Sequence, residues 1–449
     1  TSAHGPMTDR SQVGLGIGAT WYAAPCPSRQ PLPALDGLCQ TEVCIVGGGL
    51  AGLVLAQELV NHGVDVVLIE AREIGAGASG RNGGFCSPGW AASDESIEKR
   101  LGLDRARVLY DLSYEGFTLI RELLPELDRT PGHLQVSTYS NAKALRQFCE
   151  HRAVYYGQVL EYVDIETVRS CLKTTRYYQG VRDADAFHCN PLQLCQTLLD
   201  TLQSTSVRVY EHTALTRFSA ATDGWHIETP AGSVRAQKMV WCCGGYGGAE
   251  FSGLRNRFLP ITTYIGVTSP LGPPLQDVIR TSDAVSDDRR AGNYYRLVGD
   301  NRLLWGGDIT AFGRHDPAQI ARRMAQDIAG IFPALALDNG HVPIEYAWSG
   351  LMGYARHMMP LVGQLSPGLW ACTGFGGHGL NTSAAAARVV AEALTDRSDR
   401  WQLFSPFSFS WNGGAAGPTA VEICYRLMKL SDRWRAFRAR RATRGEPIS

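Results

Sequence analysis

An apolar strand pattern runs directly into a glycine motif at Val43-Cys44-Ile45-Val46-Gly47-Gly48-Gly49-Leu50-Ala51-Gly52. A helix-forming stretch follows, and a second apolar strand ends at Glu70, twenty-three residues after Gly47. Gly47 permits the tight turn, Gly49 lets backbone amides approach a pyrophosphate, and Gly52 allows close packing of helix on strand. The stretch therefore predicts a complete β-α-β dinucleotide-binding unit.

The acid at the end of the second strand narrows the choice of nucleotide. A carboxylate at Glu70 accepts hydrogen bonds from the adenosine ribose hydroxyls and disfavours a phosphate on the ribose. The positive end of the helix that begins near Leu50 faces the pyrophosphate. A glycine motif alone also occurs in ordinary turns, but here strand, helix, second strand and acid are in register. The unit favours FAD or NAD over NADP.

Length and composition indicate an ordinary globular enzyme. At 449 residues, the chain is too long for one core, so we expect two domains. Lys plus Arg and Asp plus Glu both number 43, which leaves no basic excess to attract nucleic acid or an anionic membrane. No apolar run approaches the roughly 20 residues needed to span a bilayer. We expect a cytoplasmic protein with no membrane span and no nucleic-acid partner.

The twelve cysteines are scattered along the chain. No pair of Cys-x-x-Cys units suggests a metal site, so we expect reduced thiols and no metal. The adjacent Cys242 and Cys243 could form a redox disulfide, which would suit a thiol-disulfide flavoenzyme. Small buried residues at the end of a strand are the favoured interpretation.

Two further glycine-rich segments favour FAD over NAD. Residues 75–90 are too rich in glycine for a helix or a sheet. Residues 372–381 precede an alanine-rich helix and again direct backbone amides and a helix N-terminus at a partly negative group. A nicotinamide cofactor needs only the first motif, whereas FAD is wrapped at several points. Residues 376–380 would then meet the pyrimidine end of the isoalloxazine.

Hydrophobic periodicity predicts several elements. The pattern between residues 91 and 173 is mainly helical. We expect helices at 105–127, 140–156, 191–204, 317–331 and 382–395. We expect strands at 207–211, 225–228, 233–236, 239–245, 294–297 and 302–307. Residues 8–40 form an extended N-terminal arm. Residues 401–449 form a C-terminal helical tail, which we expect to dock on the FAD domain with its basic end in solvent.

The motifs are similar to those of the D-amino acid oxidase, or glycine and sarcosine oxidase, superfamily of FAD-dependent oxidoreductases. Within it the chain most resembles the gamma-glutamylputrescine oxidoreductase-like group. The resemblance covers nearly the whole chain, and its most specific part is Gly77-Ala78-Ser79-Gly80-Arg81-Asn82-Gly83-Gly84. Further matches are Trp21-Tyr22, Asn190-Pro191, Tyr210-Glu211-His212-Thr213, Trp348-Ser349-Gly350 to Gly363, and Gly374 to Asn381.

This resemblance implies an α/β fold, α+β overall, of the glutathione-reductase-like FAD type found in amine oxidases. A Rossmann-like FAD-binding domain, discontinuous over residues 41–90, 190–260 and 346–400, is interleaved with a substrate domain. The substrate domain spans residues 91–189 and 261–345, and its antiparallel sheet covers the flavin.

The motifs and the resemblance together imply a set of cofactor-binding residues. Leu215 falls where a residue packs on the adenine, and the strand end at Cys242 lines the cofactor. The full set is Gly47, Gly49, Leu50, Ala51, Gly52, Glu70, Ala71, Arg72, Gly77, Ala78, Ser79, Gly80, Arg81, Asn82, Gly83, Gly84, Leu215, Cys242, Gly244, Gly350, Gly374, Gly377, His378, Gly379, Leu380 and Asn381.

Departures from the family pattern bear on the substrate. Glycine oxidases carry a carboxylate-binding arginine two residues after a Trp-Ala-Gly-like triplet, and that place is held here by Met352. A thioether cannot bind a carboxylate. Sarcosine oxidases use a lysine where this chain has Asn381, and they attach flavin through a cysteine where it has Gly350. We therefore expect noncovalent FAD and an amine without the usual carboxylate contact.

The expected reaction is oxidation of a C–N bond of a primary or secondary amine. Hydride passes to flavin N5, the imine hydrolyses to an aldehyde or ketone, and FAD is reoxidised by O2, giving H2O2, or by another acceptor. His378 is the leading protein participant, with an ordinary turn histidine as the alternative. His357 and Arg356 are second candidates. Identity of the amine and oligomeric state stay open.

Two other functions remain as alternatives. A D-amino acid, glycine or sarcosine-type oxidase would use Arg296, together with Tyr295, or Arg356 for the substrate carboxylate. A structural ion pair is the competing interpretation of Arg296. Aromatic walls from Tyr294, Tyr295 and Trp305 would suit an amine, although ordinary sheet packing explains them equally well. The second alternative is a flavin-binding subunit that is inactive alone.

Overall fold

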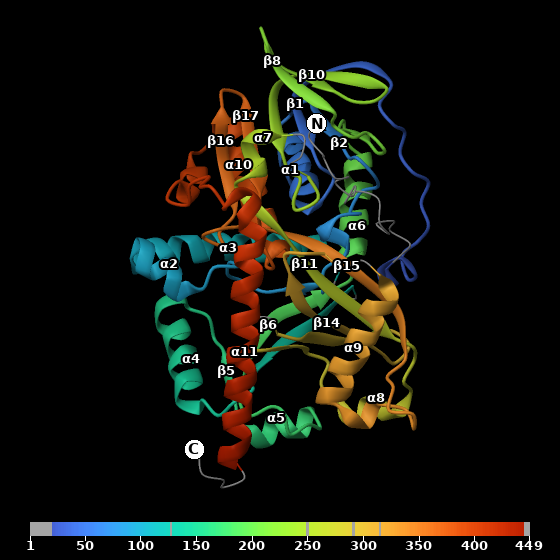
Figure 1. Ribbon diagram of the computed structural model, residues 1–449. Helices are drawn as coiled ribbons and strands as arrows, with labels where there is room; N and C mark the ends of the chain where they lie inside the picture. The colour runs from blue at the N-terminus through green and yellow to red at the C-terminus, as the bar shows by residue number, and fades with distance from the viewer. Residues whose placement is uncertain (1–19, 126–127, 248–250, 290–291, 314–315, 444–449) are drawn as a thin grey trace, which may run out of the picture.

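The computed structural model describes residues 20–125, 128–247, 251–289, 292–313 and 316–443. Two large sheets form its framework, and Figure 1 shows them one above the other, with helix α11 (Gly417–Thr443) running along the outside. We call them sheet A and sheet B. The mixed α/β architecture agrees with the fold class expected from the sequence.

Sheet A is the nucleotide-binding sheet. Its parallel strands lie in the order β17 (Leu369–Thr373), β10 (Gly232–Trp241), β1 (Gly37–Val46), β2 (Val66–Ile69) and β7 (Arg208–Tyr210). Antiparallel additions are β16 (Leu361–Ser366) beside β17, and β9 (Gly224–Glu228) with β8 (Arg217–Ala221) beside β10. Order and direction match a Rossmann-like sheet.

The predicted β-α-β unit occupies the middle of sheet A. β1 pairs in parallel with β2, from Val43 opposite Val66 to Val46 opposite Ile69, and α1 (Leu50–Asn61) connects them. A Cβ added at Gly52 would lie 2.0 Å from the carbonyl oxygen of Gly47. Helix and strand approach this closely because the glycine has no side chain.

Both faces of sheet A are covered. Alternate residues of β1 point to opposite sides, as strand geometry requires. Val43 and Ile45 pack in the same core as α1, α3 (Leu103–Leu123), α6 (Pro191–Gln203) and α10 (Gly379–Leu394). Cys44 and Val46 pack with β8, β9 and β10 residues. This is why β1 reads as a continuous apolar run.

Sheet B is mainly antiparallel. Its order is β15 (Ile344–Ala355), β11 (Phe258–Thr268), β14 (Arg302–Thr310), β13 (Tyr294–Val298), β12 (Ala284–Asp287), β4 (Arg129–Val136), β6 (Gly180–Cys189) and β3 (Phe85–Cys86), with β5 (Glu161–Val163) beside β6. Helices α5 (Ile165–Cys171), α8 (Pro273–Val278) and α9 (Pro317–Ile331) cover the face turned away from sheet A (Figure 1).

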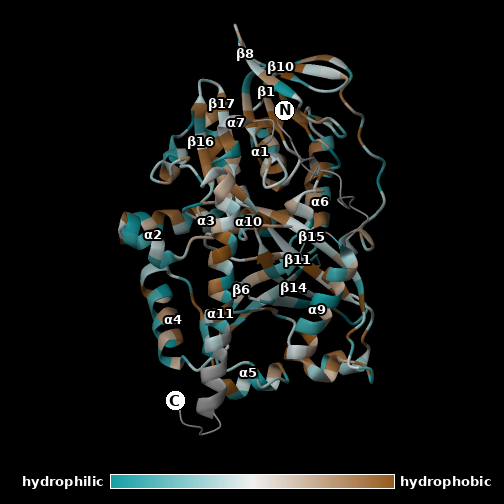
Figure 2. Ribbon diagram, viewed as in Figure 1, coloured by the Kyte–Doolittle hydropathy of each residue, from teal (hydrophilic) through white to brown (hydrophobic). Residues whose placement is uncertain are grey.

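The remaining elements lie at the periphery. Figure 2 shows α2 as a strongly hydrophilic helix on the outside of the molecule. The peripheral helices are α2 (Asp94–Leu101), α4 (Ala142–Tyr156) and α7 (Ser252–Arg255), and the short 3-10 turns are η2 (Trp21–Ala23), η3 (Ala78–Gly80), η5 (Pro333–Leu335), η6 (Arg400–Phe404) and η7 (Gly414–Ala416).

Most predicted helices and strands are present within a few residues, and five predictions need correction. Residues 91–173 are not mainly helical throughout, because β4 and β5 lie within them. The sequence did not predict β4, because its side chains do not alternate regularly. Its pairing with β6 shifts at Pro131 and Gly132. The glycine-rich segment 75–90 contains the turn η3 and the two-residue strand β3. The N-terminal arm, predicted to reach residue 40, ends where β1 begins at Gly37.

The boundary placed at residue 346 also moves. It falls inside β15, all of which pairs with β11 of sheet B, so this segment belongs to the antiparallel sheet up to Ala355. The tail is helical as predicted, but α11 lies against β14 of sheet B and not on the nucleotide-binding sheet. Residues 8–19 of the arm and 444–449 of the tail lie outside the described residues.

Among the described residues, no two cysteines form a disulfide, and this includes the adjacent Cys242 and Cys243. The Cys243 thiol lies 3.4 Å from the carbonyl oxygen of Val46, which suits a packed strand end. Across the part of the chain that the structure describes, no helix is long and apolar enough to cross a membrane. The same residues bring together no group of three or more His, Cys, Asp or Glu side chains that could hold a metal ion.

Candidate functional site

The first glycine motif ends at the N-terminus of α1. The Leu50 amide donates to Ser79 Oγ at 2.8 Å, which joins this motif to the second glycine-rich segment. The amides of Ala51 and Gly52 lie in the first turn of α1. Amides in the first turn have no carbonyl within the helix to donate to. These amides and the helix dipole suit a pyrophosphate.

Glu70 is held at the end of β2 beside this turn. Its carboxylate accepts from the Gly48 amide at 2.7 Å and from the Arg72 amide at 3.0 Å. Burial raises the pKa of Glu70, and the bonds from Gly48 and Arg72 oppose that rise. Each carboxylate oxygen can accept more than one hydrogen bond, so the geometry leaves room for ribose hydroxyls.

The second glycine-rich segment is fixed by Asn82. Its side-chain nitrogen donates to the carbonyls of Ala78 at 3.0 Å and Ser79 at 2.9 Å, and its side-chain oxygen accepts from the Gly84 amide at 2.8 Å. The Tyr22 hydroxyl donates to the Asn82 carbonyl at 2.6 Å. The loop is therefore a rigid structure, and the aromatic residue of the N-terminal arm contributes to it.

The third glycine segment lies against the second. His378 Nε2 donates to the carbonyl oxygen of Ser87 at 3.0 Å, and the Asn381 side chain donates to the carbonyls of Gly89 at 3.0 Å and Ser113 at 3.3 Å. The three glycine segments thus converge on one region. The Asn381 side chain joins α10 to α3 through these bonds. Only the backbone of Asn381 then remains to make the contact with a cofactor that the sequence predicts.

Open space between the two sheets fits a flat ring. A Cβ at Gly244 would meet no atom within 4 Å, and a Cβ at Gly350 would meet only Tyr246 Oη at 3.8 Å and Arg81 Cβ at 4.0 Å. Gly244 follows β10 of sheet A, and Gly350 lies in β15 of sheet B. The residues present therefore fit an extended dinucleotide, and its ring system would lie near Gly244 and Gly350.

The sequence pattern missed Tyr246. Its hydroxyl accepts a hydrogen bond from the Leu351 amide at 3.0 Å, and its ring lies 3.3 Å from the Cβ position of Gly77. Tyr246 therefore links the end of sheet A, the second glycine segment and β15. The sequence signal that could have identified Tyr246 is its position between two pairs of glycines directly after a predicted strand.

Met352 faces the third glycine segment. Its sulfur lies 3.4 Å from the Cβ position of Gly377 and 4.0 Å from the Tyr354 hydroxyl. Tyr354 itself was missed, although it follows Met352 by two residues and so shares its face of β15. Burial raises the pKa of Tyr354, so its hydroxyl stays protonated near neutral pH.

Aromatic side chains form the neighbouring wall. The Phe85 ring packs edge-on against His133 and against Tyr294, each with centroids 5.7 Å apart. Tyr294 lies against Gly83 and Gly306, where any larger residue would collide with its ring. Burial lowers the pKa of His378, and the pKa of His133 is lowered to about 4. Near neutral pH, this wall is aromatic and carries no histidine charge.

Arg296 is a structural residue, which corrects its expected role as a carboxylate binder. Its Nε donates to the Gly83 carbonyl at 2.9 Å, and its Nη2 donates to the Cys189 carbonyl at 2.8 Å. Its Nη1 donates to His188 Nδ1 at 3.3 Å. The guanidinium is buried and holds the second glycine segment against β6.

Replacing Arg296 with Met is expected to lower the free energy of unfolding by roughly 3 kcal/mol, because two buried carbonyls lose their donors. For a chain of this size, that corresponds to a fall in Tm of about 3 °C. The exposed Arg356 supplies the control, since Arg356→Met should change Tm by less than about 1 °C. An unchanged Tm in Arg296→Met, with a raised KM for α-amino acids only, would restore the carboxylate role.

Tyr295 and Trp305 do not face the site, which corrects their expected place in it. Their rings stack at 4.5 Å with an interplanar angle of 8°, and both pack edge-on against Phe332. They belong to the core on the far face of sheet B. Neighbouring Tyr294 points the other way because successive residues of a strand alternate.

Arg356 and His357 lie in the turn that follows β15. Arg356 is exposed in the turn after β15. His357 Nδ1 accepts from the Met359 amide at 3.1 Å, and its Nε2 donates to the Ser408 carbonyl at 3.2 Å. These contacts make His357 a turn residue that packs on the C-terminal segment.

His188 gives this region a pH-dependent stability. Its Nε2 donates to the Ser282 carbonyl at 2.9 Å, and burial together with the Arg296 charge lowers its pKa to about 3. The folded state therefore resists protonation while the unfolded state takes up a proton near its usual pKa of about 6.5. This stability is present above pH 6.5 and is lost as pH falls, by about 1.4 kcal/mol per pH unit.

We expect the Tm of the wild type to fall more steeply than that of His188→Asn between pH 6.5 and 4, since the variant lacks this titrating group. Thermal unfolding at constant ionic strength measures both slopes. Parallel slopes would show that His188 is protonated as easily in the folded chain as in the unfolded one.

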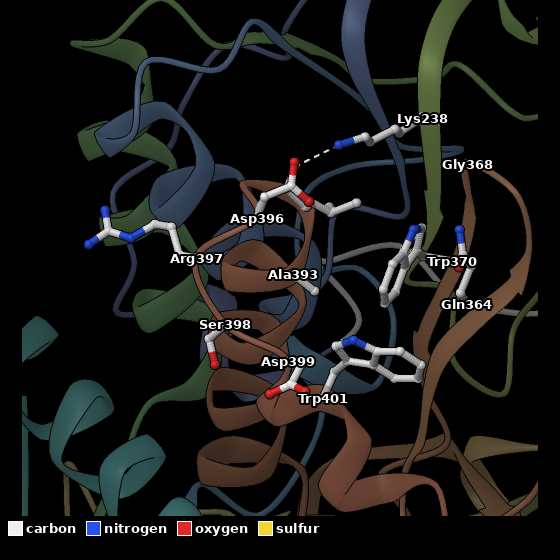
Figure 3. Close-up of a pocket in the computed structure, with 11 residues that line it drawn as sticks. Lys238, Gln364, Gly368, Trp370, Ala393, Asp396, Arg397, Ser398, Asp399 and Trp401 are labelled. Carbon is white, nitrogen blue, oxygen red and sulfur yellow. Dashed lines mark hydrogen bonds between the residues drawn. The ribbon is translucent and has the colours of Figure 1, made fainter.

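A separate surface cavity of about 550 Å³ lies at the opposite end of α10 from the glycine segments (Figure 3). Trp370 and Trp401 meet edge to face there at 5.2 Å, and Lys238 donates to the Leu394 carbonyl at 2.6 Å. α10 runs from Gly379 to Leu394, so a helix of about 24 Å separates this cavity from the third glycine segment. It is therefore not part of the candidate site.

Comparisons with known proteins show the family and the fold of this chain. The family model described as DAO, FAD dependent oxidoreductase, matches residues 42–393. Gamma-glutamylputrescine oxidoreductase from Escherichia coli is 32% identical over 394 residues, covering 86% of this chain and 91% of that protein. The probable oxidoreductase OrdL from Rhizobium meliloti is 29% identical over 443 residues, covering 97% of this chain and 100% of that protein.

Solved structures show the same fold. Glycine oxidase from Geobacillus kaustophilus superposes with a TM-score of 0.69 at 19% identity, covering 83% of this chain and 99% of that one. Glycine oxidase from Bacillus cereus gives a TM-score of 0.66 at 17% identity, with 81% and 98% covered. The two-sheet architecture is therefore shared with these oxidases.

Proposed function

The chain belongs to the DAO family of FAD-dependent oxidoreductases, and from that premise we propose that it oxidises a C–N bond of a primary or secondary amine lacking an α-carboxylate. The family establishes an enzyme that uses FAD. Bound FAD supplies a two-electron acceptor whose N5 takes a hydride from the carbon next to nitrogen. The residues around it decide which substrate reaches that position.

The observation that carries this proposal is the place of Met352. It faces the third glycine segment beside Tyr354, on the strand where the resemblance places a carboxylate-binding arginine. Arg296 is engaged by backbone carbonyls, and Arg356 is exposed in a turn. Neither replaces the missing arginine, so a substrate carboxylate has no evident partner among them.

Each part of the candidate site has a role in this proposal. The amides at the start of α1 would hold the pyrophosphate, and Glu70 would accept hydrogen bonds from the ribose. The amides at the start of α10 would stabilise the negative charge that the flavin pyrimidine gains on reduction. We propose noncovalent attachment, because Gly350 offers no thiol where sarcosine oxidases have one.

The uncharged side chains beside Met352 suit an alkyl amine. Tyr354 lies beside Met352, and Phe85 packs on Tyr294 next to Gly83, so these rings would limit the orientations available to an alkyl amine. His378 is neutral near pH 7 because burial lowers its pKa, so it does not repel an amine. The imine product then hydrolyses in water to an aldehyde or ketone.

The E. coli relative supports an amine substrate, since its name refers to a derivative of putrescine, which is an amine. A glycine-type or D-amino acid oxidase is the second candidate, and the solved glycine oxidases support it through their fold alone. The substrate carboxylate distinguishes the two.

Peroxide release by the isolated yellow holoenzyme tests the proposal. We expect turnover with butylamine or N-methylbutylamine and at least about tenfold lower kcat/KM with norvaline of either hand, which differs from butylamine by the α-carboxylate. Turnover with norvaline alone would favour the second candidate. Flavin reduction without peroxide would indicate an acceptor other than O2, and no reduction by any amine would indicate a flavin-binding subunit.

A further inference from the structure

Helix α11 has one face docked on sheet B. Glu422 accepts from the Thr310 hydroxyl at 2.8 Å and from the Ala311 amide at 3.2 Å. Lys429 binds the Asp308 carboxylate and donates to the Ile309 carbonyl at 3.3 Å. Tyr425 lies between these residues along the helix and is half-buried. These contacts fix which side of α11 remains outside.

The outward side carries a line of large apolar residues. Ile423, Leu427, Leu430 and Trp434 are 54%, 60%, 58% and 56% exposed. Their spacings of four, three and four residues place them on one stripe of a helix, about 17 Å long. We call these four residues the apolar stripe. Monomeric proteins rarely expose such a continuous apolar line without a function.

The charge of α11 is strongly positive. Between Gly417 and Thr443, it contains seven Lys or Arg residues and only two acids, Glu422 and Asp432. The helix therefore carries a net charge of +5, while the whole chain is neutral. Arg426 pairs with Glu422 at 3.5 Å, and its side chain is 76% exposed one residue before Leu427 of the apolar stripe. The balance of the whole chain concealed this local excess.

We propose that the apolar stripe of α11 binds the surface of an anionic lipid bilayer. An interfacial helix combines leucine and tryptophan on one face with Lys or Arg beside it, and it lies in the plane of the membrane. α11 lies along the outside of the molecule (Figure 1), and hydrophobic and hydrophilic segments alternate along it (Figure 2). Because Glu422 and Lys429 hold the opposite side of α11 on sheet B, the apolar stripe can bind a surface while the helix stays docked.

Charge favours lipid over a second copy of this chain. Pairing two α11 helices would bring two charges of +5 together, whereas anionic headgroups attract Lys and Arg. The apolar stripe alone does not decide this, because a coiled coil has the same spacing. Docking on sheet B also leaves only one side of α11 for a partner.

Vesicle flotation with the full-length holoenzyme tests the proposal. We expect the enzyme to float with phosphatidylcholine vesicles containing about one-third phosphatidylglycerol and not with pure phosphatidylcholine vesicles, and we expect added salt to weaken binding. The variant carrying Leu427→Glu and Leu430→Glu should bind at least about tenfold more weakly. Its flavin absorbance should equal that of wild type, because both positions are exposed.

A matched control lies elsewhere on the surface. Val154 and Val159 are 65% and 84% exposed outside α11, so Val154→Glu with Val159→Glu makes the same charge change at apolar surface positions. This control should keep wild-type vesicle binding. Equal loss in both variants would overturn the proposal, as would absence of flotation with anionic vesicles.

Light scattering tests the alternative that a second copy of this chain covers the apolar stripe. If wild type is a dimer that the Leu427→Glu and Leu430→Glu pair makes monomeric, and no vesicle is bound, a second copy covers the stripe and the proposal is wrong. Flotation is measured without substrate, so its failure is distinguishable from failure of the proposed amine oxidation.

Discussion

Replacing Gly52 with valine is expected to yield protein that purifies without stoichiometric FAD. A Cβ at this position would lie 2.0 Å from the Gly47 carbonyl oxygen and 3.3 Å from Ile45 Cγ2. Since backbone cannot move aside as a flexible side chain can, α1 must shift away from β1. Such overpacking costs roughly 1 to 3 kcal/mol.

That shift moves the amides at the start of α1, so we expect FAD affinity to fall at least about 100-fold. The ratio of flavin to protein absorbance, followed by titration of apoprotein with FAD, measures the loss. Gly330→Val is the matched control, because Gly330 is exposed in α9 and a Cβ there meets no atom within 4 Å. Stoichiometric yellow flavin in Gly52→Val would contradict the placement of the pyrophosphate.

Replacing Met352 with arginine is expected to reverse the substrate preference. The new guanidinium would stand near Gly377 and Tyr354, where it would repel an alkylammonium ion and attract an α-carboxylate. At about 5 Å and an effective dielectric constant near 20, two unit charges interact by about 3 kcal/mol. We expect kcat/KM for butylamine to fall about 100-fold and that for norvaline to rise at least about tenfold.

Met352→Leu separates charge from shape. The two side chains are similar in size and both are uncharged, so this variant should retain kcat/KM for butylamine within about threefold. Steady-state kinetics on both substrates, with flavin content measured for each variant, makes the comparison. If Met352→Arg leaves both substrates unaffected while FAD stays bound, Met352 does not contact the substrate.

The β-α-β unit was predictable because its signals are local. Glycines at fixed spacing, an apolar run and a terminal acid all lie within residues 43–70, and β1, α1 and β2 lie where that pattern puts them. That the other two glycine segments lie at the same site could be predicted only because FAD is bound at several points along its length. The bonds of His378 to Ser87 and of Leu50 to Ser79 supply the contact that no spacing along the chain could give.

Side-chain direction was the main limit elsewhere. Tyr294 and Tyr295 are adjacent in sequence, yet one faces the glycine segments and the other lies in the far core. The periodicity of a strand predicts that Tyr294 and Tyr295 point to opposite faces of the sheet, but it does not predict which of them faces the site. Arg296 was misassigned for a related reason, since its partners Gly83 and Cys189 come from distant parts of the chain.

The tail shows a different limit. Its helix was evident from spacing, but the pattern alone could not say which apolar residues meet sheet B. Glu422 and Lys429 bind β14 through polar contacts, and this turns Leu427 and Leu430 outward. A hydrophobic stripe in a sequence predicts a buried face only when another element is available to cover it.

Anaerobic bleaching of the bound flavin tests the central claim most directly, because it reports the half-reaction without any electron acceptor. The holoenzyme would be mixed under argon with a library of primary and secondary amines and their α-carboxylated counterparts, and the loss of flavin absorbance would be followed. We predict rapid bleaching by amines without an α-carboxylate and much slower bleaching by their carboxylated counterparts. Bleaching by α-amino acids alone would contradict the account.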